Sequence, residues 1–169
     1  EEAQIEIHRD AVFAALSRHI AIAVPSSKMH ALPGVITLMD NLAQDKRFLL
    51  SLVTGNVQRT VEHKLRAVGI DPGLFLGGAF GDEHLDRNAL PALALYRLSQ
   101  MQGVQIPPEK ALVIGDTPHD IACAHHTGLK VLSVATGLYK IEELEKHQPD
   151  YLIKDLSDTE NVLGILQKF

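Results

Sequence analysis

Apolar residues follow two different spacings along this chain, and each spacing predicts a type of secondary structure. Short continuous apolar runs are typical of strands buried on both faces, and apolar residues recurring every three or four positions are typical of helices. The predicted strands span residues 47–53, 74–80, 111–114, 130–135 and 151–153, the second being short and glycine-rich. The predicted helices span residues 1–23, 35–44, 57–68, 86–102, 118–127, 141–146 and 159–167. This alternation predicts an α/β fold with a doubly wound parallel sheet.

The first 31 residues differ from the rest of the chain. Their predicted helix places Ile5, Phe13 and Ile20 at helical spacing, and residues 24–33 are a connector rich in Pro and Ser. We therefore expect a helical segment and linker at residues 1–31, followed by an α/β core at 32–169.

Composition and charge limit the classes of partner. The chain has 169 residues, 46% of them hydrophobic, and a net charge of −5 without a basic run, so no nucleic-acid partner is expected. No apolar stretch reaches transmembrane length, so no membrane partner is expected either. The single Cys123 fits a reducing compartment, and we expect a cytoplasmic protein of unspecified oligomeric state. Because the first Met is Met29, we also expect the native translation start to lie upstream of Glu1.

Two carboxylates follow the apolar run 111–114 in the segment Gly115-Asp116-Thr117-Pro118-His119-Asp120. Thr117 is a candidate helix N-cap, with Pro118 at the first helical position and Asp120 at the third. Asp116 and Asp120 then lie at the carboxyl end of a strand, where open α/β sheets bind ligands, and two carboxylates suit Mg²⁺. The same pattern equally fits a simple strand-to-helix connection in which Asp120 only caps the helix.

A second strand-to-helix turn, Thr54-Gly55-Asn56, has the residues of an anion site. A Thr hydroxyl and the free N–H groups of a helix start can bind phosphate, although Asn56 also fits as an ordinary helix N-cap. Arg87 is a candidate cation for a phosphate oxygen. Lys64 competes for that role, and we interpret it as a solvated surface charge.

Several other site classes lack their motifs. The chain contains neither Gly-x-Gly-x-x-Gly nor Gly-x-Ser-x-Gly, and its nine histidines show no zinc spacing. His119 is expected near the mouth of the site because it lies between the two carboxylates in sequence.

Three segments, taken together and in order, resemble the haloacid dehalogenase (HAD) superfamily, in particular its phosphoglycolate-phosphatase-like branch. They are Leu52-Val53-Thr54-Gly55-Asn56, the helix containing Arg87, and the segment from Val113 to Asp120; the flanking Leu32-Pro33-Gly34-Val35 and Val134-Ala135-Thr136-Gly137 also look like that branch. The resemblance implies a Rossmann-like core at residues 32–169, with residues 1–31 as the remnant of a helical cap. It also implies a Mg²⁺-dependent phosphatase acting on a small phosphorylated metabolite.

The resemblance implies a role for each matching residue. Thr54 hydrogen-bonds the transferring phosphoryl group, helped by the backbone of Gly55 and Asn56. Arg87 stands where the family usually has a Lys that neutralises the phosphate. Asp116 binds Mg²⁺, and Asp120, which we group with Thr54 and Arg87 as catalytic, holds the metal or its waters.

One family motif is missing. No Asp-x-Asp occurs in the chain, whereas the family carries Asp-x-Asp-x-Thr on its first, central strand, with the nucleophile and the general acid/base. We therefore expect the nucleophile to lie upstream, the core to lack its first strand, and this chain alone to be inactive. The alternative is a non-catalytic HAD-like domain that binds phosphate or a protein partner.

Overall fold

A computed structural model describes residues 2–24, 27–84 and 86–169, with the side chains of residues 2–7 and 9 excluded. Some predictions therefore fall outside the described part: those for Glu1 in the first helix, for the Ile5 side chain, and for Pro25 and Ser26 in the connector. The helices are α1 (Glu2–Ala23), α2 (Val35–Gln44), α3 (Gln58–Ala67), α4 (Leu90–Gln102), α5 (Pro118–His126), α6 (Ile141–Glu145) and α7 (Thr159–Leu166). The strands are β1 (Leu52–Thr54), β2 (Gly78–Phe80), β3 (Leu112–Gly115), β4 (Lys130–Val134) and β5 (Tyr151–Ile153).

The strands form two separate parallel sheets. One contains β1 and β2, and the other has the order β3-β4-β5. Leu52 pairs with Gly78 in the first sheet, while Val113 pairs with Val131 and Leu132 with Tyr151 in the second. The predicted α/β class and the parallel pairing are confirmed, but β1 and β3 are not hydrogen-bonded to each other.

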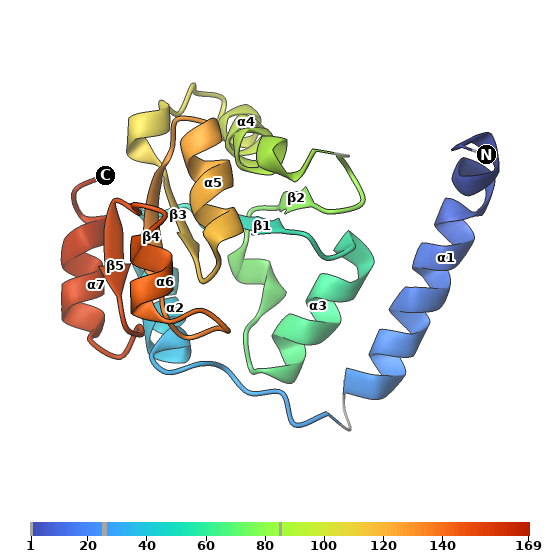
Figure 1. The fold of residues 1–169 in the computed structure, drawn as a ribbon, viewed down its shortest axis with the longest axis horizontal. Coiled ribbons are helices and arrows are strands. Elements are labelled where there is room, and N and C mark those ends of the chain that lie inside the picture. The colour runs from blue at the N-terminus through green and yellow to red at the C-terminus, as the bar shows by residue number, and fades with distance from the viewer. Residues whose placement is uncertain (1, 25–26, 85) are drawn as a thin grey trace.

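Helices cover both faces of the three-stranded sheet, because successive residues of β4 point to opposite sides. Leu132 packs with Leu38 of α2 and Val162 of α7, whereas Val131 packs with Ile121 of α5 and Leu144 of α6. Figure 1 shows α5 and α6 in front of this sheet and α7 and α2 at its side. α4 packs separately against β2, where Ala79, Leu90 and Ala94 are buried together. The arrangement is therefore doubly wound, as predicted.

α1 extends beside the rest of the molecule and contacts α3 (Figure 1). The Ser17 hydroxyl donates a hydrogen bond to the Arg59 carbonyl oxygen at 3.1 Å. Phe13 and Ile20 are half-buried, but Val12 and Leu16 are exposed. Among the described residues, no helix is both long and apolar enough to cross a lipid bilayer.

Three local predictions differ from the structure. The apolar run 47–53 forms a strand only from Leu52 to Thr54, because a parallel ladder extends only as far as its partner, and β2 has three residues. The predicted helix 86–102 begins with a 3₁₀ turn, Arg87–Ala89. Asn56 is not the N-cap of α3: Val57 holds that position, and the Asp82 carboxylate accepts the N–H of Gln58 at 3.0 Å.

An ion pair joins the end of β2 to α4. The Arg97 guanidinium donates to both carboxylate oxygens of Glu83 at 2.8 Å, and also to the Gly78 carbonyl oxygen at 2.7 Å. The Glu83 carboxylate accepts a further hydrogen bond from the Phe80 N–H at 2.9 Å. The hydrogen bonds from Arg97 are the main reason that the pKa of Glu83 lies below its usual value.

We expect Glu83→Gln to lower the free energy of unfolding by about 1 kcal/mol at pH 7, because a bidentate charged pair is lost. A carboxyl with a lowered folded-state pKa stabilises the fold above its unfolded pKa, and this stabilisation disappears as pH falls through the folded-state value. The difference between variant and parent should therefore shrink below about pH 4, since an unfolded Glu titrates near 4.3. Urea unfolding between pH 3 and pH 7 measures it.

Glu62→Gln is the matched control. Glu62 forms an exposed pair with Arg66 at 3.9 Å, and such pairs contribute little to stability. Equal losses in the two variants, or a Glu83→Gln deficit that persists at pH 3, would contradict the prediction.

Candidate active site

The carboxyl ends of β1 and β3 open into one cavity of about 300 Å³. Its walls include all six residues that the sequence singled out for phosphate or metal binding: Thr54, Gly55, Asn56, Arg87, Asp116 and Asp120. These residues come from three segments that are well separated in sequence. Because β1 and β3 belong to different sheets, the cavity lies where the two sheets face each other.

The turn after β1 is held by its own side chains. Thr54 Oγ1 accepts hydrogen bonds from the Asn56 N–H at 3.1 Å and from the Asn56 Nδ2 amide at 2.8 Å. A hydroxyl that accepts twice still has its own O–H to donate. The Thr54 hydroxyl is therefore available as a donor to an anion in the cavity.

Two cations lie at this turn. The Arg87 guanidinium lies directly over Gly55, where a Cβ would overlap it, so only glycine permits this approach. The Lys64 ammonium donates to the Asn56 side-chain oxygen at 2.5 Å. Lys64 is half-buried and bound to Asn56, and our interpretation of it as a solvated surface charge stays a prediction. Among the described residues, Arg87 has no carboxylate partner, whereas the Lys64 ammonium is already hydrogen-bonded.

The turn after β3 forms the predicted capping box. Thr117 is the N-cap of α5, and its hydroxyl oxygen accepts the Asp120 N–H at 3.2 Å. In return, Asp120 Oδ2 accepts the N–H groups of Asp116 and Thr117 at 3.1 and 3.0 Å and the Thr117 hydroxyl at 2.8 Å. A Cβ on Gly115 would overlap the Asp120 side chain. Asp120 is thus held in one orientation through a single carboxylate oxygen.

Asp116 lies beside Asp120 and is half-buried against Gly137. Burial is the main cause that raises the pKa of the Asp116 carboxyl above its usual value, and the nearby Asp120 charge raises it further. Two carboxylates that repel each other in a partly desolvated cavity would both gain from a bound cation.

The two carboxylates of the cavity are oxygen donors of the kind that Mg²⁺ prefers. Within the described ranges, no group of three or more His, Cys, Asp or Glu side chains is arranged to hold a metal. Mg²⁺, however, is commonly bound through one or two carboxylates together with waters and substrate phosphate oxygens. Asp116 and Asp120 match that smaller requirement.

Two further residues line the cavity: His119, which was expected only near its mouth, and Cys123, which the sequence did not indicate. His119 lines the cavity, and its Nε2 atom is buried without a hydrogen-bond partner among the described residues. Cys123 also lines the cavity, one turn after Asp120, and its thiol donates to the Asp120 carbonyl at 3.3 Å. Burial, and then the Asp120 charge, raises the pKa of this thiol. The three-residue spacing from Asp120 was a signal that could have placed Cys123 here.

Comparisons of sequence show which proteins this chain resembles. Residues 87–159 match the family described as HAD-hydrolase-like. The pyrophosphatase PpaX of Bacillus pumilus is 31% identical over 130 residues, covering 76% of this chain and 58% of that protein. The phosphoglycolate phosphatase of Pasteurella multocida is 30% identical over 136 residues, covering 78% of this chain and 56% of that protein. The chain therefore spans less than two thirds of the curated relatives that it matches.

Solved structures share the fold. A predicted phosphoglycolate phosphatase from Haemophilus somnus superposes with a TM-score of 0.64 at 27% identity, covering 78% of this chain and 56% of that one. CbbY from Rhodobacter sphaeroides, solved with phosphate, has a TM-score of 0.71 at 23% identity, covering 90% of this chain and 64% of that one. The sequence matches and the shared fold place this chain in the haloacid dehalogenase superfamily.

Proposed function

We propose that this chain is the larger part of a Mg²⁺-dependent phosphomonoester hydrolase that acts on a small phosphorylated metabolite. The observation that carries the proposal is the convergence of Thr54, Arg87 and Asp116 on one cavity at the carboxyl ends of β1 and β3. Relatives named as a pyrophosphatase and a phosphoglycolate phosphatase support the substrate class. In this proposal residues 32–169 are the core and residues 1–31 are the remnant of a cap.

The turn after β1 binds the transferring phosphoryl group. The Thr54 hydroxyl would donate to one of its oxygens and the Arg87 guanidinium would neutralise its charge. The backbone N–H of Gly55 belongs to the same turn, and that of Asn56, which here donates to Thr54 Oγ1, would have to exchange this partner to take part. Lys64 holds the Asn56 side chain and thereby orients the turn. Thr54, Asn56 and Lys64 hold one another through hydrogen bonds before substrate arrives, and such preorganisation favours charge stabilisation in a transition state.

The turn after β3 binds the cofactor. Asp116 and Asp120 would hold Mg²⁺, and the capping box keeps Asp120 in place for that purpose. When bound, Mg²⁺ neutralises charge on the phosphoryl oxygens. Asp116 is the more direct ligand, because the described hydrogen bonds already occupy one oxygen of Asp120.

The reaction also needs a nucleophile. We propose that a carboxylate from a segment outside these 169 residues attacks phosphorus, forming an aspartyl-phosphate that water then hydrolyses. The attack forms one O–P bond as the bond from phosphorus to the leaving alcohol oxygen breaks, and the alcohol takes up a proton. Water then cleaves the acyl phosphate, releasing phosphate and restoring the carboxylate.

The test compares the complete gene product with this chain. We expect the complete protein to hydrolyse members of a phosphate-monoester panel only with Mg²⁺, and the purified 169-residue chain to give no turnover, because it lacks the nucleophile. Initial rates of phosphate release measure both. Turnover by the isolated chain that is lost on Asp116→Asn would refute the external nucleophile, and inactivity of the complete protein on the whole panel would favour a non-catalytic binding domain.

A further inference from the structure

The loop after β2 brings Arg87 to the turn after β1. The structure describes this loop at residues 81–84 and 86, and Arg87 follows in the 3₁₀ turn Arg87–Ala89. Arg87 is exposed, yet its guanidinium lies over Gly55. A long side chain has many conformations, so it keeps one position only where its backbone is firmly held. The contacts that hold the loop therefore determine where this cation lies.

The loop approaches the turn after β1 through its backbone. The Gly81 N–H donates to the Asn56 carbonyl oxygen at 3.0 Å. A Cβ on Gly81 would overlap the Gly55 carbonyl group, which shows how closely the two backbones lie. Because the two backbones are in contact, a shift of the loop would change the position of Arg87 relative to Gly55.

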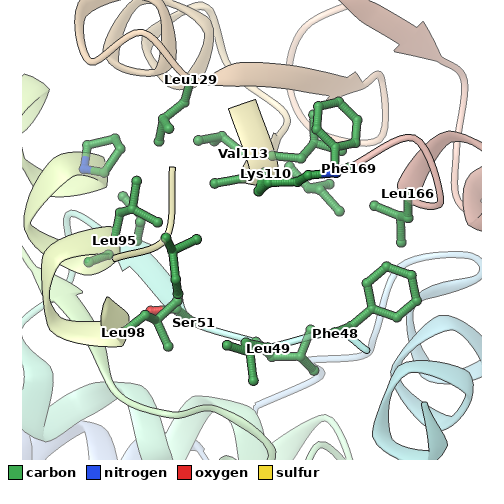
Figure 2. Close-up of a pocket in the computed structure, with 18 of the residues that line it drawn as sticks. Phe48, Leu49, Ser51, Leu95, Leu98, Lys110, Val113, Leu129, Leu166 and Phe169 are labelled. Carbon is green, nitrogen blue, oxygen red and sulfur yellow. The ribbon is translucent and has the colours of Figure 1, made fainter. Parts of the chain in front are cut away.

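The next two residues of the loop are acidic, and each bonds to a different helix. Glu83 pairs with Arg97 of α4 at 2.8 Å, and Arg97 also donates to the Gly78 carbonyl of β2. Figure 2 shows Leu95 and Leu98 of α4 at the wall of a mainly apolar cavity of about 600 Å³. Arg97 is not part of that wall, and its two partners lie in the loop and on β2. The Glu83 pair thus joins the loop to α4 and to its own strand.

Asp82 holds the loop at a different helix, α3. Its Oδ1 atom accepts the N–H of Gln58, the first residue of α3, at 3.0 Å, and the Asp82 side chain is half-buried. Val57, the N-cap residue, makes no side-chain hydrogen bond to the start of this helix. A carboxylate is favoured there by the free N–H groups and by the helix dipole. Because α3 directly follows the turn that contains Thr54, this hydrogen bond joins the Arg87 loop to that turn.

We propose that Asp82 is a positioning residue for the phosphate-binding cation: by bonding to the start of α3, it keeps the Arg87 guanidinium over Gly55. Asp82 does not line the 300 Å³ cavity, so it acts on a bound phosphoryl group only through Arg87. The use of Arg87 for phosphate rests on the proposed function. The tether itself rests on the hydrogen bond from Gln58 and on the contact between the two backbones.

Two substitutions remove this hydrogen bond from its two ends. Asp82→Ala removes the acceptor, and Gln58→Pro removes the donor at the first position of a helix, where proline is favoured. The backbone of Val57 is extended, as a residue before proline requires. We expect each variant of the complete protein to lose about tenfold in kcat/KM for a phosphate monoester, and the double variant to lose no more. Asp82→Asn, which keeps an acceptor oxygen, should stay within about threefold of the parent.

A variant that already lacks the guanidinium shows whether the effect passes through Arg87. In an Arg87→Ala background, Asp82→Ala should change kcat/KM by less than about twofold, because the group that Asp82 positions is gone. An undiminished tenfold loss in that background would overturn the proposal, since Asp82 would then act by another route.

Asp71→Ala is the matched control for the loss of a capping carboxylate. Asp71 accepts the Gly73 N–H at 2.9 Å at the start of the 3₁₀ helix Pro72–Leu74, and it does not line the 300 Å³ cavity. Its removal should leave turnover unchanged. Equal losses of activity in Asp71→Ala and Asp82→Ala would indicate a general loss of stability and would also overturn the proposal.

Nuclear magnetic resonance separates the tether from the proposed function. Because the guanidinium lies against Gly55, the ¹⁵N-labelled complete protein should show a nuclear Overhauser effect between the Arg87 Nε–H and a Gly55 Hα. We expect Asp82→Ala and Gln58→Pro to lose this signal and Asp82→Asn to keep it. Persistence of the signal in both of the first two variants would overturn the proposal. Its loss in both, with no turnover of phosphate esters by the parent, would support positioning by Asp82 and count against the phosphatase.

Discussion

Asp116→Asn is expected to lower Mg²⁺-dependent phosphate-ester hydrolysis by the complete protein about a thousandfold, because a charged metal ligand supports several kcal/mol of transition-state stabilisation. The amide keeps the shape of the carboxylate but not its charge. Mn²⁺ affinity, measured by electron paramagnetic resonance as a substitute for Mg²⁺, should fall about tenfold or more in the same variant. Full activity with unchanged metal affinity would remove Asp116 from the proposed site.

The free energy of unfolding of Asp116→Asn shows whether the variant remains folded, which is the control for its loss of activity. Burial and the Asp120 charge raise the pKa of Asp116 in the folded state, so its charge opposes folding at neutral pH without metal. The variant should therefore be as stable as the parent at pH 7, or more stable by up to about 1 kcal/mol. This gain should vanish below about pH 4, where an unfolded Asp is also protonated.

Asp40→Asn is the comparison variant for activity. Asp40 is exposed on α2, outside both cavities, and its removal should leave turnover unchanged. Loss of activity in both variants would indicate a general effect of carboxylate removal, not a metal site at Asp116.

Arg87→Ala is expected to reduce kcat/KM of the complete protein about a hundredfold, since a charge-assisted contact to phosphate contributes roughly 2–3 kcal/mol. Arg87→Lys should recover only part of this loss, because an ammonium lacks the planar fork of the guanidinium. Lys64→Ala should reduce kcat/KM by about tenfold at most, because its ammonium acts through Asn56. Steady-state kinetics on one phosphate monoester measures all three.

Gly55→Ala tests the same cation without removing it. The added methyl would occupy the position of the Arg87 guanidinium and displace it, so kcat/KM should fall toward that of Arg87→Ala. If Lys64→Ala had the larger effect and Gly55→Ala were neutral, Lys64 would be the cation that binds phosphate.

The parts of the fold that depend on local chemistry were predictable. Thr117, Pro118 and Asp120 occupy the predicted first positions of α5, because a capping box is made within four consecutive residues. The apolar runs that became β3, β4 and β5 were recognised for a similar reason, since a buried parallel strand is apolar throughout. The placement of Thr54 and Asp116 near each other was also predictable, because both follow parallel strands and the carboxyl ends of such strands lie on the same side of the fold.

The parts that depend on contacts between distant residues were not predictable. Asp82 caps α3 across 24 residues, and this displaced Asn56 from its predicted role. Arg87 reaches Gly55 only because β2 pairs with β1 and brings the following loop back over the turn. A single sequence contains no local signal for such contacts. The same limit applies to Lys64, whose contact with Asn56 depends on how α3 leaves the turn.

The division of the sheet also affects how the molecule unfolds. Among the described strands, no backbone ladder crosses from β1–β2 to β3–β4–β5. The two halves are joined by packing instead: α4 and the 3₁₀ turn Arg87–Ala89 lie against α5, and Phe48 and Leu50 pack against the core beside β4. Side-chain packing transmits cooperativity less strictly than a continuous ladder does. We therefore expect the half that holds Thr54 and the half that holds Asp116 to lose structure separately. The geometry of the proposed site then depends on the association of the two halves.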